Sequence, residues 1–179
     1  MSLFDIALDD QTPLFNSGYQ LPHFEERQHI NIDLININPY WINLIQTHDI
    51  EVYRVELFYG PENLPYTMGI HTDRSYGDWG KINWVFGGAG SQMHWYKPLS
   101  SASREVKATA VHSNYNLFEP EEVRLIYSAT ISSPSIVQVG LPHNITTPGN
   151  ERWCYSMVMR DKHTNDNVTF HRLKKIFGK

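Results

Sequence analysis

The stretch that decides the fold begins at residue 52 with Val-Tyr-Arg-Val-Glu-Leu-Phe-Tyr (52–59) and continues into Gly-Pro-Glu-Asn (60–63). Apolar and polar side chains alternate in the first run, as in a half-buried β-strand, and the second run is a turn. Similar short runs recur further along, at residues 81–86, 92–97, 107–111, 123–131, 135–139 and 152–159. About eight short strands separated by turns are typical of a sandwich, barrel or jelly roll.

The chain on either side of these strands predicts an irregular arm, one short helix and a helical tail. Residues 1–28 show no sustained periodicity, and residues 29–37 alternate weakly, which fits a strand. Asn38 is a good helix N-cap and Pro39 a good first helical residue, so we expect a helix that ends near His48. Residues 169–179 fit an amphipathic helix that either docks on the domain or offers a basic surface to an acidic partner.

Glycine and proline mark the connections between strands. The run Gly-Gly-Ala-Gly-Ser at 87–91 separates the apolar runs 81–86 and 92–97, so we expect a hairpin there. Residues 74–80, Arg-Ser-Tyr-Gly-Asp-Trp-Gly, fit either a mobile lid over a substrate or an ordinary surface loop.

Length and composition bound the class of protein. The 179 residues predict a single domain, with a core over about 51–160, an N-terminal arm and helix over 1–50, and a basic tail over 161–179. Aromatic residues make up 13% of the chain and favour strands. The formal net charge is −4, from 15 Lys and Arg against 19 Asp and Glu, which argues against nucleic acid or an anionic membrane as partner.

The single cysteine, Cys154, cannot form an intrachain disulfide, which fits a reducing compartment. The N-terminus lacks the basic and apolar regions of a signal peptide, and no stretch approaches the ~20 apolar residues of a membrane helix. A cytoplasmic location is therefore expected.

His71-Thr72-Asp73 is the first candidate for chemistry. Residues two apart in a strand share a face, so His71 and Asp73 point the same way. An imidazole and a carboxylate on one face supply two of the three ligands of a facial triad, which binds Fe(II) and leaves three positions open. His23-Phe24-Glu25 has the same spacing but lies in the irregular arm, and a solvated His-Asp pair remains the alternative for residues 71 and 73.

The second candidate region runs from His143 to Arg152 and contains the turn dipeptide Pro148-Gly149. If residues 147–150 form a four-residue turn between paired strands, His143 and Arg152 are diagonal neighbours on one face, about 7–8 Å apart. Arg152 then lies where it can bind a carboxylate in a bidentate pair. The alternative is an exposed arginine and a hydrogen-bonded histidine at a strand edge.

The order His-x-Asp, distal His, and Arg nine residues further on resembles the 2-oxoglutarate/Fe(II)-dependent dioxygenases over residues 51–159. Lys81-Ile-Asn-Trp-Val-Phe-Gly-Gly and Met93-His-Trp-Tyr-Lys are similar to uncharacterised oxygenase-like proteins of marine viruses, and a looser likeness to aspartyl/asparaginyl β-hydroxylases follows the His-x-Asp. The resemblance implies a mainly β, double-stranded β-helix fold (jelly roll, cupin-like), preceded by the short helix.

The same resemblance implies roles for individual residues. His71, Asp73 and His143 would be the catalytic iron ligands, and Arg152 would bind the distal carboxylate of 2-oxoglutarate. Many relatives carry a hydroxyl residue two places after that arginine; here the place holds Cys154, and Ser156 is a substitute. Two further residues on the expected hairpin strands, Asn83 and Tyr96, are candidates for contact with the cosubstrate.

These expectations amount to an oxygenase that uses O2 to hydroxylate a small molecule or an amino-acid side chain. Two other classes stay open: a cupin-like metal- or ligand-binding module without oxygenase activity, and a structural jelly-roll protein without metal. The aromatic content fits either a face of a homodimer or a substrate cleft.

Overall fold

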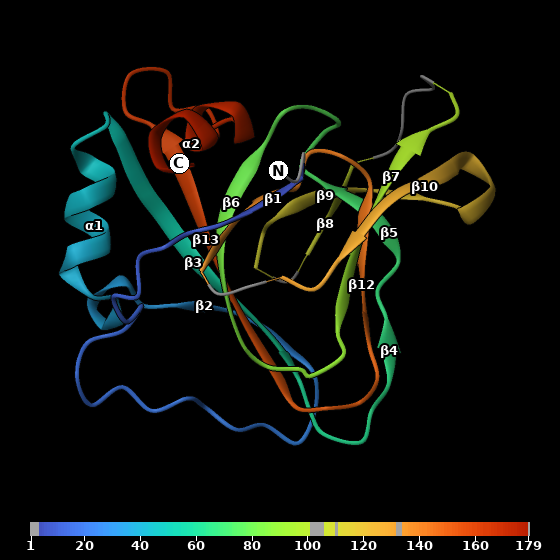
Figure 1. Cartoon of the computed structure of the whole chain (residues 1–179), viewed down its shortest axis with the longest axis horizontal. Helices are drawn as coiled ribbons and strands as arrows, with labels where there is room; N and C mark the ends of the chain where they lie inside the picture. The colour runs from blue at the N-terminus through green and yellow to red at the C-terminus, as the bar shows by residue number, and fades with distance from the viewer. Residues whose placement is uncertain (1–3, 101–105, 110, 132–133, 179) are drawn as a thin grey trace.

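The computed structural model describes residues 4–100, 106–109, 111–131 and 134–178. It is mainly β, as predicted, and its strands form two antiparallel sheets (Figure 1), an arrangement consistent with a β-sandwich. In chain order the strands are β1 (Asp5–Ala7), β2 (Gln28–Ile32), β3 (Ile50–Gly60), β4 (Tyr66–Thr67), β5 (Ile70–Asp73), β6 (Gly80–Gly87), β7 (Gln92–Pro98), β8 (Lys107–Ala108), β9 (Asn114–Phe118), β10 (Val123–Ala129), β11 (Ser135–Gln138), β12 (His143–Thr147) and β13 (Arg152–Asp161).

The strand order explains how distant segments meet. The six-stranded sheet has the order β1-β11-β6-β13-β3-β2, and the seven-stranded sheet has the order β10-β7-β12-β5-β9-β8, with β4 beside β12. Eight of these strands pair in a nested way: β3 with β13, β5 with β12, β6 with β11, and β7 with β10. The first of the eight therefore pairs with the last, and the two middle ones pair with each other.

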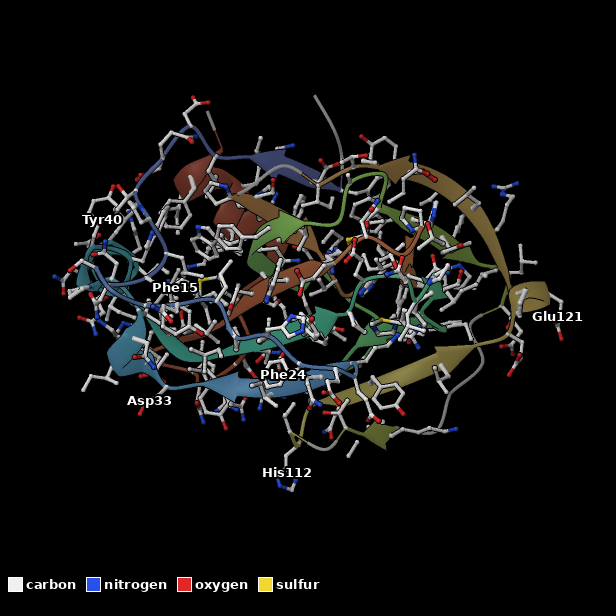
Figure 2. The ribbon with its side chains drawn as sticks, turned by 90° about the horizontal axis from the view of Figure 1, so that it is seen from below. Phe15, Phe24, Asp33, Tyr40, His112 and Glu121 are labelled. Carbon is white, nitrogen blue, oxygen red and sulfur yellow. The ribbon has the colours of Figure 1, made fainter. Side chains whose placement is uncertain are left out.

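The helices begin where their capping residues predict. In α1 (Pro39–Gln46) the side chain of Asn38 accepts a hydrogen bond from the Tyr40 N–H at 3.0 Å, which confirms the predicted N-cap. In α2 (Phe170–Phe177) Thr169 caps in the same way. Two 3₁₀ turns complete the set, η1 (Leu34–Asn36) and η2 (Pro120–Glu122). Figure 2 shows α1, marked by Tyr40, and η2, marked by Glu121, at opposite ends of the molecule.

The main apolar core lies on one face of the six-stranded sheet. Figure 1 shows α1 beside β3 and α2 near β6, away from β7 and β10. Trp41 and Ile45 of α1 and Leu173 of α2 are fully buried against this face. Of the two alternatives for the C-terminal helix, α2 therefore follows the one in which it docks on the domain. The opposite face of the same sheet is more polar, and it is turned toward the seven-stranded sheet.

Two expected hairpins are wrong, and for the same reason. β6 and β7 lie in different sheets, so residues 87–91 carry the chain from one sheet to the other. Gly87, Gly88 and Gly90 all have positive φ there, which glycine adopts without steric cost. β12 and β13 also lie in different sheets. His143 and Arg152 are therefore on opposing walls and are not diagonal neighbours on one face.

Smaller expectations are also corrected. The arm contains a short strand, since Ile6 pairs with Ile136, and the strand expected over 29–37 is β2 followed by η1. Of the run 107–111 only β8 is a strand, and Ala110 lies outside the described residues, as do residues 1–3 of the arm and Lys179 of the tail. Within the described chain, none of the helices has the length and apolar character needed to cross a membrane.

Candidate metal centre and its cavity

His71 and Asp73 share one face of β5, as the spacing predicts. Ile70 and Thr72 are buried on the other face of the strand. Nε2 of His71 lies 3.4 Å from Oδ1 of Asp73. Because both side chains leave a short strand on the same side, the imidazole and the carboxylate point into the space between the two sheets.

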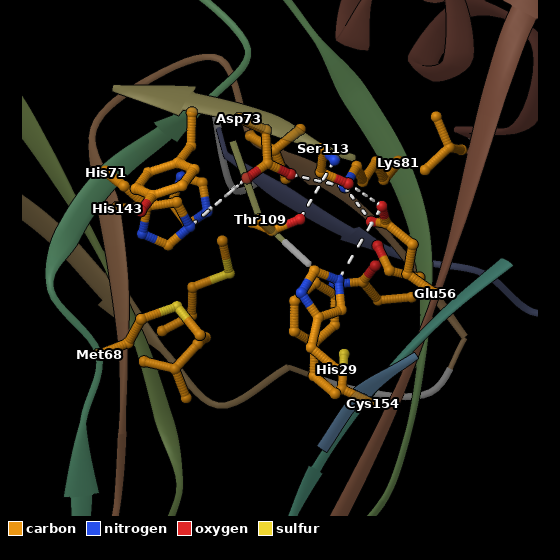
Figure 3. Close-up of a pocket in the computed structure, with 18 of the residues that line it drawn as sticks. His29, Glu56, Met68, His71, Asp73, Lys81, Thr109, Ser113, His143 and Cys154 are labelled. Atoms are coloured by element: carbon orange, nitrogen blue, oxygen red, sulfur yellow. Dashed lines mark hydrogen bonds and ion pairs between the residues drawn. The ribbon is translucent and has the colours of Figure 1, made fainter. Parts of the chain in front are cut away.

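His143 reaches the same point from β12. It is the direct cross-strand partner of His71, and the two rings have centroids 4.4 Å apart. Nε2 of His143 lies 3.9 Å from Oδ1 of Asp73. One ligand atom from each of the three residues lies within 4.8 Å of the others, which is close enough to hold one metal ion (Figure 3).

The orientation of both imidazoles is fixed by backbone carbonyls. Nδ1 of His71 lies 2.9 Å from the carbonyl oxygen of Gly69, and Nδ1 of His143 lies 2.9 Å from that of Leu141. A carbonyl oxygen can only accept, so Nδ1 of each ring carries the hydrogen and Nε2 keeps its lone pair. Both free nitrogens face Asp73, which is the arrangement that outer partners of metal-binding histidines produce.

Asp73 is held by a lysine that the sequence did not single out. Nζ of Lys81 lies 2.7 Å from Oδ2 of Asp73 and 2.9 Å from Oε2 of Glu56. Glu56 is fully buried and also binds Arg54 at 2.9 Å and the hydroxyl of Ser113. Lys81 therefore occupies one oxygen of Asp73 and leaves Oδ1 to face the histidines (Figure 3).

The electrostatics favour the ligating protonation states. Burial alone would raise the pKa of Asp73, but the positive charge of Lys81 lowers that pKa well below its usual value. Burial and the neighbouring His71 lower the pKa of His143 to about 4. At neutral pH the site thus presents a carboxylate and a neutral His143, which are the forms that bind a metal ion.

The lowered pKa of His143 predicts how the stability of the metal-free protein depends on pH. Between pH 6.5 and about 4 the unfolded chain takes up a proton that folded His143 does not, so the free energy of unfolding falls by up to ~3 kcal/mol across that window as pH decreases. Above pH 6.5 this contribution is constant. Urea denaturation over a pH series should show a flatter slope in His143→Gln and an unchanged one in His163→Gln, an exposed control. Equal slopes in the two variants would contradict the assignment.

The three residues open into a cavity of about 660 Å³ between the sheets. Arg152, at the start of β13, lines this cavity and is only 8% exposed. Its Nε has no hydrogen-bond partner, and its guanidinium has no carboxylate partner among the described residues. Gly88 makes room for it, since a Cβ at that position would lie 2.7 Å from Cγ and Cδ of Arg152. A buried, unpaired guanidinium in a cavity is a site for an anion.

The other predicted contacts divide between the cavity and its surroundings. Asn83, Ser156 and Cys154 line the cavity. Tyr96 does not: it is three residues from the cavity-lining Met93 along β7, so it faces the other side of the sheet. The expectation for Tyr96 is therefore corrected, and its hydroxyl donates to Asn144 at 3.1 Å.

Two further sequence candidates have ordinary structural contacts. His23 of the rival His-x-Glu pair is bound to Glu151 at 2.8 Å and is outside the cavity. In the loop 74–80, the Gly77 N–H donates to the carbonyl of Gly140 at 3.0 Å, and Trp79 packs on a core cluster. This loop is tied to the segment just before His143.

Lys81, Glu56 and Arg54 are site residues that spacing in the sequence did not identify. Glu56 carried a usable signal, because a carboxylate within a run of strand residues needs a partner once it is buried. That partner, Lys81, is 25 residues away on β6, a strand that is not adjacent to β3. No local spacing connects the two, so the pair follows only from the tertiary arrangement.

Comparisons with known proteins add little to this geometry. No family model matches the chain, and no curated protein matches it. Among solved structures, it has a weak likeness to the crystal structure of Peruvianin-I, a cysteine peptidase from Thevetia peruviana latex, with 13% sequence identity, coverage of 94% of this chain and 95% of that chain, and a TM-score of 0.33. A likeness at that TM-score carries no argument about fold or function.

Proposed function

We propose that this chain is an Fe(II)- and 2-oxoglutarate-dependent oxygenase that hydroxylates a small molecule or an amino-acid side chain. One observation carries the proposal: two histidines and one aspartate converge on a cavity that also contains a buried arginine without a counter-ion. The first three residues suit a non-haem Fe(II) ion, and the arginine suits the carboxylate of a cosubstrate.

The nested strand pairing supports a finer fold assignment within this proposal. A jelly roll is a long hairpin folded onto itself, so its first and last strands pair, as do its two middle strands. The pairs β3–β13, β5–β12, β6–β11 and β7–β10 follow that order. We therefore assign the sandwich to the double-stranded β-helix class, in which β5 and β12 bring the candidate ligands together.

The donor set fits the proposed metal. His71 and His143 present Nε2 lone pairs because their Nδ1 hydrogens are bound to carbonyls, and Asp73 presents Oδ1 because Lys81 binds Oδ2. Two imidazoles and one carboxylate form the facial triad of Fe(II) oxygenases. When bound, iron and 2-oxoglutarate supply the oxygen chemistry.

The other residues of the site bind and orient the cosubstrate and exclude water from it. Arg152 binds the distal carboxylate of the cosubstrate through its unpaired guanidinium, and Asn83 and Ser156 offer polar groups on the strands beside it. Oδ1 of Asn83 is buried without a partner in the described chain, so it is available to a ligand donor. Met93 and Val139 add apolar wall, which keeps water from the reacting region.

An anaerobic titration tests the proposal directly. Fe(II) followed by 2-oxoglutarate is expected to give the weak visible charge-transfer band of the chelate in the wild-type protein. If metal raises the melting temperature but 2-oxoglutarate adds nothing, a cupin-like metal-binding module is the better description. If neither has an effect on folded protein, a structural jelly roll replaces both readings.

Replacing Arg152 with glutamine is expected to weaken 2-oxoglutarate binding about 10–100-fold while leaving Fe(II) affinity unchanged. The loss corresponds to one charge-assisted hydrogen-bonded pair, about 1.5–3 kcal/mol. The same titration gives both affinities. Arg124→Gln, on an exposed position of β10, is the matched control. Loss of Fe(II) binding together with 2-oxoglutarate binding would show that Arg152 has a structural role instead.

A further inference from the structure

Cationic side chains are concentrated on the cavity wall. Among the residues that the structure describes, six Lys and Arg side chains line the cavity, but only two Asp and Glu side chains do. The cations are Arg27, Arg54, Arg74, Lys81, Arg152 and Arg160, and the carboxylates are Glu56 and Asp73. This wall therefore has a formal excess of four positive charges within a chain whose net charge is −4.

A β-bulge places two neighbouring residues of β3 on this wall. Arg54 and Val52 pair with consecutive residues of β13, which leaves Tyr53 as the extra residue. Val52 and Val55 are both buried in the core on the opposite face, while Tyr53 and Arg54 between them both line the cavity. Bulges beside functional sites commonly re-aim a side chain in this way.

The ring of Tyr53 makes cation–π contacts with two guanidinium groups. Cζ of Arg160 lies 3.4 Å from the ring centroid and Cζ of Arg54 lies 5.3 Å from it. The ring attracts both cations, but it supplies no negative charge to offset their mutual repulsion. Both guanidinium groups therefore lie beside one ring on the cavity wall, where an anion that binds them offsets their charge.

The protein itself supplies too little negative charge for this pair. Arg54 binds Glu56, but Glu56 is shared with Lys81. Arg160 donates to the neutral side chain of Asn165 at 3.1 Å. The Nε atoms of both arginines are buried and have no acceptor within the residues that the structure describes. Each of these two arginines thus has a buried N–H that an acceptor atom of a ligand could bind.

We propose that Arg54 and Arg160, gathered on Tyr53, bind the acidic group of the substrate, which is a small organic anion carrying a carboxylate or phosphate group. The inference rests on the proposed function, because it names what enters the cavity beside iron and the cosubstrate. Those two do not remove the charge excess, since a divalent metal ion adds two charges and 2-oxoglutarate offsets the same number. The cavity of about 660 Å³ lies within the ~300–1,000 Å³ range of small-molecule sites.

Inorganic phosphate is a suitable probe because it needs neither metal nor cosubstrate. It also fits Arg152, so the titrations are made with metal-free Arg152→Gln protein, which keeps the Arg54–Arg160 pair. Phosphate binding, followed by ³¹P line broadening at low salt, is expected to weaken at least about tenfold when Arg160→Gln is added, the loss of one charge-assisted contact. Adding the exposed-site change Arg124→Gln should leave it unaltered. Equal phosphate affinity in all three proteins, or equal losses in the two double variants, would overturn the proposal.

A second measurement separates this site from the oxygenase chemistry. The single variant Arg160→Gln is expected to keep the Fe(II)–2-oxoglutarate band, because it retains Arg152 and the three candidate ligands. In wild-type protein, consumption of 2-oxoglutarate should be stimulated by members of a panel of small organic acids and phosphates and not by their neutral esters. Stimulation by the neutral esters alone would refute an anionic substrate. Absence of the band in wild type would refute the oxygenase, and the phosphate titration would still decide whether the anion site exists.

Discussion

Replacing His71 with alanine is expected to abolish Fe(II) binding and, with it, the band that 2-oxoglutarate produces. The residue contributes one of three converging ligand atoms, and its direct partner across the strands is His143. Loss of an outer partner of a metal ligand already costs about 10–100-fold in affinity, so loss of a ligand is expected to exceed 100-fold. Equilibrium dialysis of Fe(II) under anaerobic conditions measures this loss of affinity.

His94→Ala is the control for this experiment. His94 lies on β7 of the same sheet, where its ring is hydrogen-bonded to Ser128 and Thr146 and lines no part of the cavity. A fold defect common to histidine removal would therefore appear in both variants, whereas a ligand defect appears only in His71→Ala. Retention of stoichiometric Fe(II) by His71→Ala would remove the basis of the metal centre.

Lys81→Met is expected to lower the free energy of unfolding by about 3–5 kcal/mol at neutral pH, the usual effect of removing one partner of a buried ion pair. Lys81 is buried between Asp73 and Glu56. Without its ammonium the two carboxylates share a poorly solvated region with less positive charge, so the pKa of Asp73 rises. Urea denaturation measures the loss, and the Fe(II) affinity should fall as well because Asp73 is no longer oriented.

Two further variants test whether the effect of Lys81→Met is specific to its ion pairs. Lys97→Met removes an exposed lysine on β7 and is expected to change stability little. Adding Glu56→Gln to Lys81→Met removes one of the two carboxylates that lost the Lys81 ammonium and should recover part of the lost stability. If Lys81→Met and Lys97→Met were equally stable, the ion pairs around Lys81 would contribute nothing to the fold.

The sequence predicts local features of this molecule better than its long-range pairing. The strand over 52–59, the cap at Asn38 and the shared face of His71 and Asp73 depend on neighbours a few residues away, and all are present in the structure. The inward direction of Arg152 was also expected, but from a hairpin that does not exist. Alternation along β13 alone gives the correct direction, because Cys154 and Ser156 line the same cavity.

The features that the sequence could not supply depend on which sheet each strand joins. A glycine-rich segment such as 87–91 can close a hairpin or cross between sheets, and its composition is the same in both cases. The bulge at Tyr53 is likewise visible only through the register with β13. The charged residues around Asp73 meet through these long-range pairings, so neither Lys81 nor the Arg54–Arg160 pair follows from spacing.

The nested pairing of strands also determines when this protein can fold during synthesis. β3 has an early partner in β2, but its other partner, β13, begins only at residue 152, long after β3 ends at residue 60. At about 5–20 residues per second on the ribosome, β3 waits on the order of ten seconds for that partner. β5, with two of the candidate ligands, waits almost as long for β12. The central pairs of both sheets therefore form late, and slow folding is the expected consequence of this topology.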